Sequence, residues 1–118
     1  MKIKCFTGLI VWQKAHKMVL AGYANTRSFP DEERFGLVAQ LRRSSASICA
    51  NLAEGYKKST REFNRYLDIA EGSLEETKYH LILSKDLHYV SESKFAEMFD
   101  QCEEIGRMLN GLIQNLTR

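Results

Sequence analysis

A chain of 118 residues with 44% hydrophobic residues, seven glycines and one proline is long enough for one packed domain and too apolar for disorder to dominate. Its three cysteines, Cys5, Cys49 and Cys102, are odd in number and far apart, so we expect neither a disulfide framework nor a zinc site, and a cytoplasmic location. The apolar run from Leu9 to Trp12 is too short for a secretory signal, and no stretch approaches the length of a transmembrane helix, so we expect neither; the net charge of +2 says little.

The first predicted helix follows an N-terminal segment without helical period, residues 1–9, which we expect to be an extended arm. From Leu9 or Ile10 onward, one helix face is marked by Trp12, Ala15, Val19, Gly22, Tyr23 and Thr26. Pro30 ends this helix, because proline disfavours helical geometry in the preceding residue and cannot donate a backbone hydrogen bond. Residues 31–34 then form an acidic turn that suits the start of the next helix.

A second helix is predicted from near Phe35, because apolar or small residues recur at steps of three and four, the period of one helix face. The stripe consists of Leu37, Leu41, Ser44, Ile48, Leu52 and Tyr56. A row of alanines lies on a different face of this helix: Ala39, Ala46, Ala50 and Ala53. We interpret that row as the other half of the core, with a contact to another subunit as the alternative.

The third helix is predicted to begin at about Thr60 and to run to about Lys85. Ser59 precedes Glu62 by three residues, which is the spacing of a capping box at a helix start. Its apolar stripe is Phe63, Leu67, Ala70 and Leu74. Gly72 lies inside this helix, where glycine costs about 1 kcal/mol relative to alanine. We attribute it to close packing between helices.

The last helix is predicted to start after Ser91, a good N-cap. Its apolar positions continue to the end of the chain: Phe95, Met98, Phe99, Cys102, Ile105, Leu109, Leu112 and Leu116. The connection at 56–59 is too short for anything except a reversal between antiparallel helices. The sequence therefore predicts an all-α fold, an up-down-up-down antiparallel four-helix bundle in which residues 1–118 form one domain.

Candidate catalytic and metal-ligating residues do not combine into a known kind of site. His16, His80 and His88 lie in three different elements, and no serine or cysteine stands beside one in a nucleophile pattern. Glu76 and His80 lack the second carboxylate and histidine pair that a di-iron bundle needs, and no glycine-rich phosphate loop occurs. We therefore predict a protein that is not an enzyme and that uses neither metal nor cofactor.

Charge is distributed unevenly along the chain. Residues 1–65 hold twelve Lys or Arg against five Asp or Glu, whereas residues 66–118 hold five against ten. Positive residues gather around the predicted bend between the second and third helices: Arg42, Arg43, Lys57, Lys58, Arg61 and Arg65. Such a surface can neutralise the phosphates of RNA or DNA in a salt-sensitive way. The alternative is a protein-interaction scaffold in which the charge asymmetry serves self-assembly.

Two polar residues near the end of the second helix are predicted to be structural. Asn51 and Glu54 stand one and two positions from the buried stripe. Glu54 is placed to accept hydrogen bonds from Arg61 or Arg65 across the bend. We interpret this as an ion pair that locks the helix hairpin, in preference to a catalytic role.

Several of these segments, taken together, resemble a known family. They are VWQKAH at 11–16, SFP at 28–30, ERFGL at 33–37, QLRRS at 40–44, NLAEG at 51–55, EF at 62–63, RYL at 65–67 and A-x-GSL-x-E at 70–76. In this combination the chain resembles the 23S rRNA-intervening sequence proteins, also labelled the S23 ribosomal protein family. Cys49 stands where that family usually has proline or another small residue, a difference that bears on packing.

The resemblance implies an up-down four-helix bundle that assembles into a ring-shaped homopentamer. Relatives with a similar fold include the accessory variability determinant of diversity-generating retroelements, which binds nucleic acid and a reverse transcriptase. The resemblance thus implies a homo-oligomer with RNA, DNA or a protein as partner, and no membrane. It implies no activity, because the family is named for the genomic location of its genes.

Overall fold

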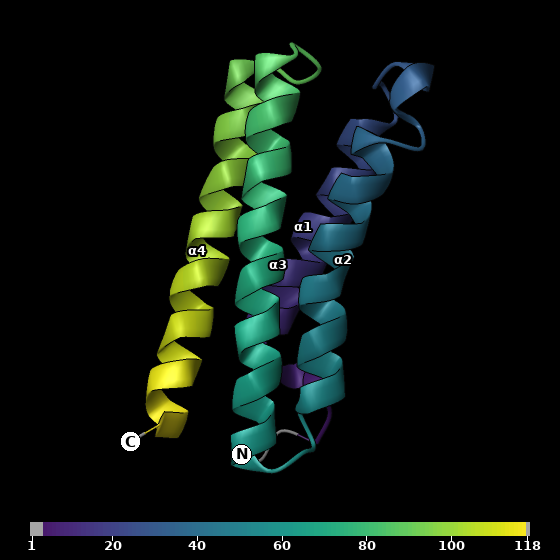
Figure 1. Cartoon of the computed structure of the whole chain (residues 1–118). Coiled ribbons are helices and arrows are strands. Elements are labelled where there is room, and N and C mark those ends of the chain that lie inside the picture. Colours follow the sequence, from purple (N-terminus) through teal and green to yellow (C-terminus); the bar gives the residue numbers. More distant parts are fainter. Residues whose placement is uncertain (1–3, 118) are drawn as a thin grey trace.

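Four long helices account for most of residues 4–117, the part of the chain that the computed structural model describes. They are α1 (Ile10–Thr26), α2 (Leu37–Gly55), α3 (Thr60–Asp86) and α4 (Glu92–Thr117), with short 3-10 helices η1 (Phe6–Gly8) and η2 (Asp31–Glu33) before α1 and α2. The helices run alternately up and down in a bundle 44 Å long and 23 Å wide (Figure 1). Residues 4–117 contain no strand. The predicted all-α four-helix bundle is confirmed.

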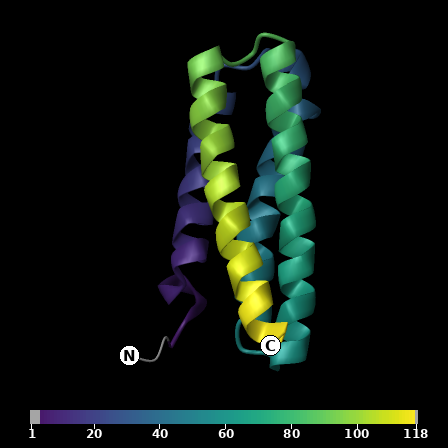
Figure 2. The same ribbon diagram turned by 90° about the vertical axis from the view of Figure 1, so that its left-hand side faces the viewer.

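Each helix packs against its neighbours in the chain, and α1 also packs against α4, which closes the bundle. Figure 2 shows that the start of α1, the α2–α3 connection and the end of α4 lie at one end of the bundle. The α1–α2 and α3–α4 connections lie at the other end. The α1–α2 and α2–α3 connections are therefore separated by the full length of α2.

The core follows the stripes that the helical period predicts. The most deeply buried members are Leu41, Ile48, Leu52, Leu67, Leu74, Ile105 and Leu109. In α1 the predicted helix face omits two core residues, Val11 and Met18, whose side chains are 3% and 1% exposed. A smaller apolar cluster of Phe29, Leu37 and Val38 covers the end with the α1–α2 connection. The side chain of Leu116 lies outside the described part of the chain.

The helix starts follow the predicted caps. The Glu62 N–H donates to Ser59 Oγ at 3.2 Å, so one half of the predicted capping box is formed and α3 begins at Thr60. The Glu62 carboxylate accepts the Ser59 hydroxyl at 3.1 Å, in place of the Ser59 N–H that a complete capping box uses. At the start of α4, the Lys94 N–H donates to Ser91 Oγ at 3.1 Å. Each cap satisfies a backbone donor that has no partner within the helix.

The N-terminal arm differs from its prediction. Residues 6–8 form η1, because the N–H groups of Gly8 and Leu9 donate to the carbonyls of Cys5 and Phe6, both at 2.9 Å. The Phe6 ring also packs edge-on against Trp12, with ring centroids 5.3 Å apart. Residues 1–3 of the predicted arm lie outside the described residues.

Two expectations about small residues are wrong. Gly72 is exposed, and a Cβ on it would meet no atom within 4 Å, so close packing does not explain this glycine. The alanine row is divided: Ala46 is half-buried and packs against the core, and Ala53 is half-buried, whereas Ala39 and Ala50 are exposed, so the row as a whole does not form the other half of the core. On α2 that second buried row consists instead of Val38, Ser45 and Cys49.

Candidate nucleic-acid interface

The reversal between α2 and α3 depends on a close contact at Gly55. This residue is buried, and a Cβ on it would lie 2.6 Å from the Tyr66 Cβ and 3.0 Å from the Phe63 Cδ1. Glycine therefore allows the end of α2 to approach the second turn of α3. The Lys58 N–H donates to the Gly55 carbonyl at 3.0 Å, which tightens the turn at the same place.

Four of the six predicted cations gather at this reversal and are called the bend cations below: Lys57, Lys58, Arg61 and Arg65. The two lysines lie in the connection, and the two arginines lie one turn apart near the start of α3. All four are exposed, and within residues 4–117 none of them has an ion pair or a side-chain hydrogen bond. Their positive charge is therefore available to an outside anion.

The backbone of α3 contributes to the same electrostatic field. A helix N-terminus carries the equivalent of about half a positive charge, and α3 begins at Thr60, between the lysine and arginine members of the bend cations. Glu62 is the acidic residue in the first turn, and its carboxylate accepts the Ser59 hydroxyl. Two exposed carboxylates, Glu62 and Glu54 near the end of α2, together with the C-terminus of α2, thus stand near four cations and the N-terminus of α3.

The other two predicted cations are not part of this cluster. Arg43 lies fourteen positions before Lys57, which corresponds to about 21 Å along a helix axis. It forms an ion pair with Glu76 of α3, and its Nε donates to Gln40 Oε1 at 3.1 Å. The predicted six-residue patch is therefore divided, and Arg43 already has a carboxylate partner within the chain.

Arg42 is held against α1. Its Nε donates to Thr26 Oγ1 at 3.0 Å, and its Nη2 donates to the Tyr23 carbonyl at 3.4 Å. The guanidinium also lies 4.4 Å from the centroid of the Tyr23 ring. These contacts fasten α2 to α1, far from the bend.

The two predicted structural polar residues behave differently from each other. Asn51 Nδ2 donates to the Ser47 carbonyl at 2.8 Å and to Ser47 Oγ at 3.1 Å, beside a 2.9 Å contact between the hydroxyls of Ser47 and Ser73 that joins α2 to α3. Glu54 is exposed and has no ion pair within the described residues, so the predicted lock with Arg61 or Arg65 is wrong. An exposed pair there would contribute little, and packing at Gly55 closes the hairpin instead.

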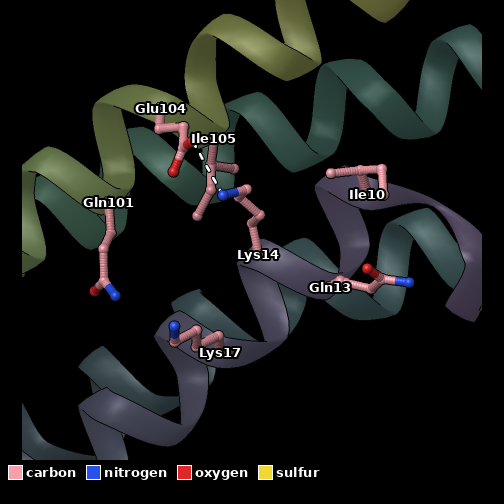
Figure 3. A pocket seen from close by; sticks show the side chains of 7 residues that line it. All are labelled: Ile10, Gln13, Lys14, Lys17, Gln101, Glu104 and Ile105. Atoms are coloured by element: carbon pink, nitrogen blue, oxygen red, sulfur yellow. Dashed lines mark ion pairs between the residues drawn. The ribbon is translucent and has the colours of Figure 1, made fainter.

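A shallow groove of about 290 Å³ between α1 and α4 was not predicted from the sequence (Figure 3). Lys14 Nζ and Glu104 Oε2 form an ion pair across it at 3.2 Å. The side chains of Lys17 and Gln101 point toward the same opening, and the Gln101 Oε1 is buried without a hydrogen-bond partner. The seven lining residues hold one carboxylate, that of Glu104, and two ammonium groups, those of Lys14 and Lys17.

Several large apolar side chains are exposed on the described part of the molecule. Phe35, which the sequence marks only as the start of α2, is 85% exposed in the α1–α2 connection, and the Arg34 guanidinium carbon lies 5.3 Å from its ring centroid. Leu20 and Tyr79 are each 57% exposed, on α1 and α3. Exposed apolar groups of this size are candidates for contacts with another protein or another copy of the chain.

Neither a metal cluster nor a membrane span is found within residues 4–117. No three His, Cys, Asp or Glu side chains there come close enough together to hold a metal ion. None of the helices in that part of the chain combines the length and apolar character needed to cross a bilayer.

Comparison with known proteins agrees with this architecture. One solved structure, a protein of unknown function from the S23 ribosomal protein family of Bacteroides thetaiotaomicron VPI-5482, is similar with a TM-score of 0.82 and 25% identity, over 89% of this chain and 96% of that one. None of the curated proteins matches the chain. The model of the 23S rRNA-intervening sequence protein family matches residues 7–111. Because this match spans nearly the whole sequence, the chain belongs to the family of 23S rRNA-intervening sequence proteins.

Proposed function

We propose that this protein is a non-enzymatic, self-associating helical bundle that binds RNA or DNA through the bend cations. The observation that carries the proposal is that Lys57, Lys58, Arg61 and Arg65 are exposed together at one end of the bundle without a carboxylate partner in residues 4–117. Cations placed in this way bind phosphates by releasing condensed counterions, so the binding depends on salt and not on base sequence.

Self-association would strengthen such binding. Several copies of the bend cations on one particle engage one nucleic acid with a high effective concentration after the first contact. The exposed Phe35, Leu20 and Tyr79 supply apolar surface for contacts between copies. The stoichiometry that we propose is the homopentamer, on the basis of the resemblance described above.

The first test is an electrophoretic titration against single-stranded RNA at about 50 and about 200 mM salt. If each of the four cations of one copy meets one phosphate, the affinity falls about 50-fold between the two salt concentrations, and by more where several copies engage the same RNA. The double variant Lys57→Gln/Lys58→Gln should bind more weakly at the lower salt and lose only about sevenfold on going to the higher salt. No binding by the wild type at the lower salt would contradict the proposal.

A matched control removes two exposed cations elsewhere. Lys17 on α1 and Arg107 on α4 are exposed and have no ion pair within the described residues. The variant Lys17→Gln/Arg107→Gln therefore changes the net charge by the same amount as the bend variant. It should keep the salt dependence of the wild type; an equal loss in both variants would indicate diffuse attraction to net charge.

The second candidate function is a protein-interaction scaffold, which the 85% exposure of Phe35 favours. In that case the bend cations would meet acidic residues of a neighbouring copy, since residues 66–118 carry the excess of negative charge. Light scattering distinguishes the two functions. Loss of the oligomer in Lys57→Gln/Lys58→Gln, with nucleic-acid binding unchanged, would favour the scaffold.

A further inference from the structure

Three arginines surround a hollow of about 200 Å³ at the opposite end of α2 from the bend cations. Arg27, Arg34 and Arg42 contribute to its lining, together with the buried Thr26 and one carboxylate, Asp31. The α1–α2 connection that forms it lies far from the α2–α3 reversal (Figure 1). We propose that this hollow binds a phosphate group, as a site separate from the bend cations.

Arg42 is fixed in position before any ligand arrives. Thr26 is 4% exposed, donates its hydroxyl hydrogen to the Gly22 carbonyl at 2.8 Å and accepts from Arg42 Nε at 3.0 Å. The Tyr23 ring and carbonyl hold the guanidinium from the other side. Two of the five N–H donors of Arg42 are used in this way, and three remain for a ligand. Binding is favoured when little side-chain freedom has to be lost.

Arg27 and Arg34 are placed by the backbone of the connection. Arg27 is the C-cap of α1, and Arg34 is the C-cap of η2, where its N–H donates to the Asp31 carbonyl at 3.0 Å. Both side chains are exposed, and neither has an ion pair within the part of the chain that the structure describes. No carboxylate therefore competes with a ligand for either guanidinium, and the contact that the Arg34 guanidinium makes is with the exposed Phe35 ring, 5.3 Å from its centroid.

The acidic residues of the connection do not cancel this charge. Glu33 is engaged elsewhere: its Oε1 accepts the Leu37 N–H at 3.2 Å, and its Oε2 accepts the Tyr89 hydroxyl at 3.0 Å. Glu32 does not line the hollow. Among the lining residues, three arginines face Asp31 alone, so the hollow keeps a net positive charge.

A hollow lined by three arginines suits a phosphate better than a carboxylate. A phosphate presents acceptor oxygens in several directions and carries up to two charges, whereas a single guanidinium fork already satisfies a carboxylate. A water molecule occupies about 30 Å³ of liquid, so the hollow has room for a phosphate together with some of its hydration. A free phosphate compound and the backbone of a nucleic acid both provide this group.

Calorimetric titration with inorganic pyrophosphate at constant ionic strength tests the site. The wild type should bind, and Arg27→Gln and Arg34→Gln should each weaken binding about tenfold or more, because each removes a charged hydrogen bond. Arg107→Gln, which removes an exposed arginine from α4, should bind as the wild type does. Absence of pyrophosphate binding, equal binding by all three variants, or equally tight binding of acetate would overturn the assignment.

Two further experiments distinguish this site from the bend cations and identify the source of the phosphate. Lys57→Gln/Lys58→Gln should leave pyrophosphate binding unchanged, and its loss there would place the site at the bend instead. RNA of one sequence is then compared with and without a 5′-phosphate. Weaker binding of both RNAs by Arg34→Gln indicates backbone phosphates, and weaker binding of the phosphorylated RNA alone indicates a terminal phosphate. If Arg34→Gln weakens the binding of pyrophosphate but of neither RNA, the natural ligand is a free phosphate compound. That result supports the proposed site equally well.

Discussion

Gly55 lies so close to Tyr66 that a Cβ on the glycine would be 2.6 Å from the tyrosine Cβ and 2.9 Å from its Cγ. This contact joins the last residue of α2 to the second turn of α3. It therefore determines how closely the two helices approach at the reversal, and with it where the bend cations lie. The same residue pair links the stability of the hairpin to the geometry of the proposed interface.

Gly55→Ala should destabilise the protein by about 1–3 kcal/mol, because the new methyl group would overlap a Cβ that cannot rotate away. Urea denaturation measures the loss as a lower unfolding midpoint. Gly72→Ala is the matched control: it adds the same methyl group to a helix, but the methyl would meet nothing within 4 Å. This control should raise stability by about 0.5–1 kcal/mol. A neutral Gly55→Ala variant would show that the close contact is not needed.

Thr77 and Ser44 form a buried hydrogen bond between α3 and α2. The Thr77 hydroxyl donates to Ser44 Oγ at 2.8 Å, and the two residues are 1% and 0% exposed. Thr77→Val should lower the free energy of unfolding by about 1 kcal/mol or more, because it removes the bond between the two buried hydroxyls and leaves Ser44 Oγ with only its 3.3 Å contact to the Leu41 carbonyl. Ser44→Ala/Thr77→Val should cost less than the sum of the two single changes. Additive costs in this double-mutant cycle would contradict the coupling.

Local patterns in the sequence predict the elements of this bundle well. The apolar residues from Leu37 to Leu52 recur every three or four positions, a pattern that lies within a single helix. The capping-box spacing at Ser59 likewise involves only a few neighbouring residues. For that reason the predicted start of α3, at about Thr60, agrees with the structure.

Relations between elements could not be predicted in the same way. Arg43 and Glu76 are 33 positions apart and meet because of how α2 and α3 are rotated about their axes, which no local pattern encodes. The pattern also does not distinguish Gly55, which needs to be small, from Gly72, which has open space beside it. The hollow at Arg34 was missed for a similar reason, since its arginines come from the end of α1, the connection and α2.

The three cysteines should differ in reactivity toward a thiol reagent at about pH 8, because the thiolate is the reactive form. Burial raises the pKa of Cys49 to about 11 and that of Cys102 to about 12. Cys5 is exposed, and the hydroxyl and N–H of Thr7 lower the pKa of its thiol. Mass spectrometry should detect rapid labelling of Cys5 alone, and Cys5→Ser should abolish it. Rapid labelling of Cys102 in the folded protein would contradict its burial.

The same two raised pKa values predict weaker stability in alkaline solution. An unfolded cysteine deprotonates near its ordinary pKa of 9.0, whereas buried Cys49 and Cys102 stay protonated up to about 11 and about 12. Between about pH 9 and about pH 12 the folded state therefore binds more protons than the unfolded state, so the free energy of unfolding falls as the pH rises. Denaturation midpoints measured upward from pH 9 should decrease, and less steeply in Cys49→Ala. A flat profile would be inconsistent with the raised pKa values.

The most direct test of the central claim is the slope of log K against log salt concentration for binding to single-stranded RNA. Replacing all four bend cations, in Lys57→Gln/Lys58→Gln/Arg61→Gln/Arg65→Gln, should reduce the magnitude of the slope by about 3 for each copy that contacts the RNA. Arg43→Gln should leave the slope unchanged, because Arg43 already has Glu76 as its ion-pair partner. A wild-type slope in the quadruple variant would contradict the claim that these cations meet the phosphates.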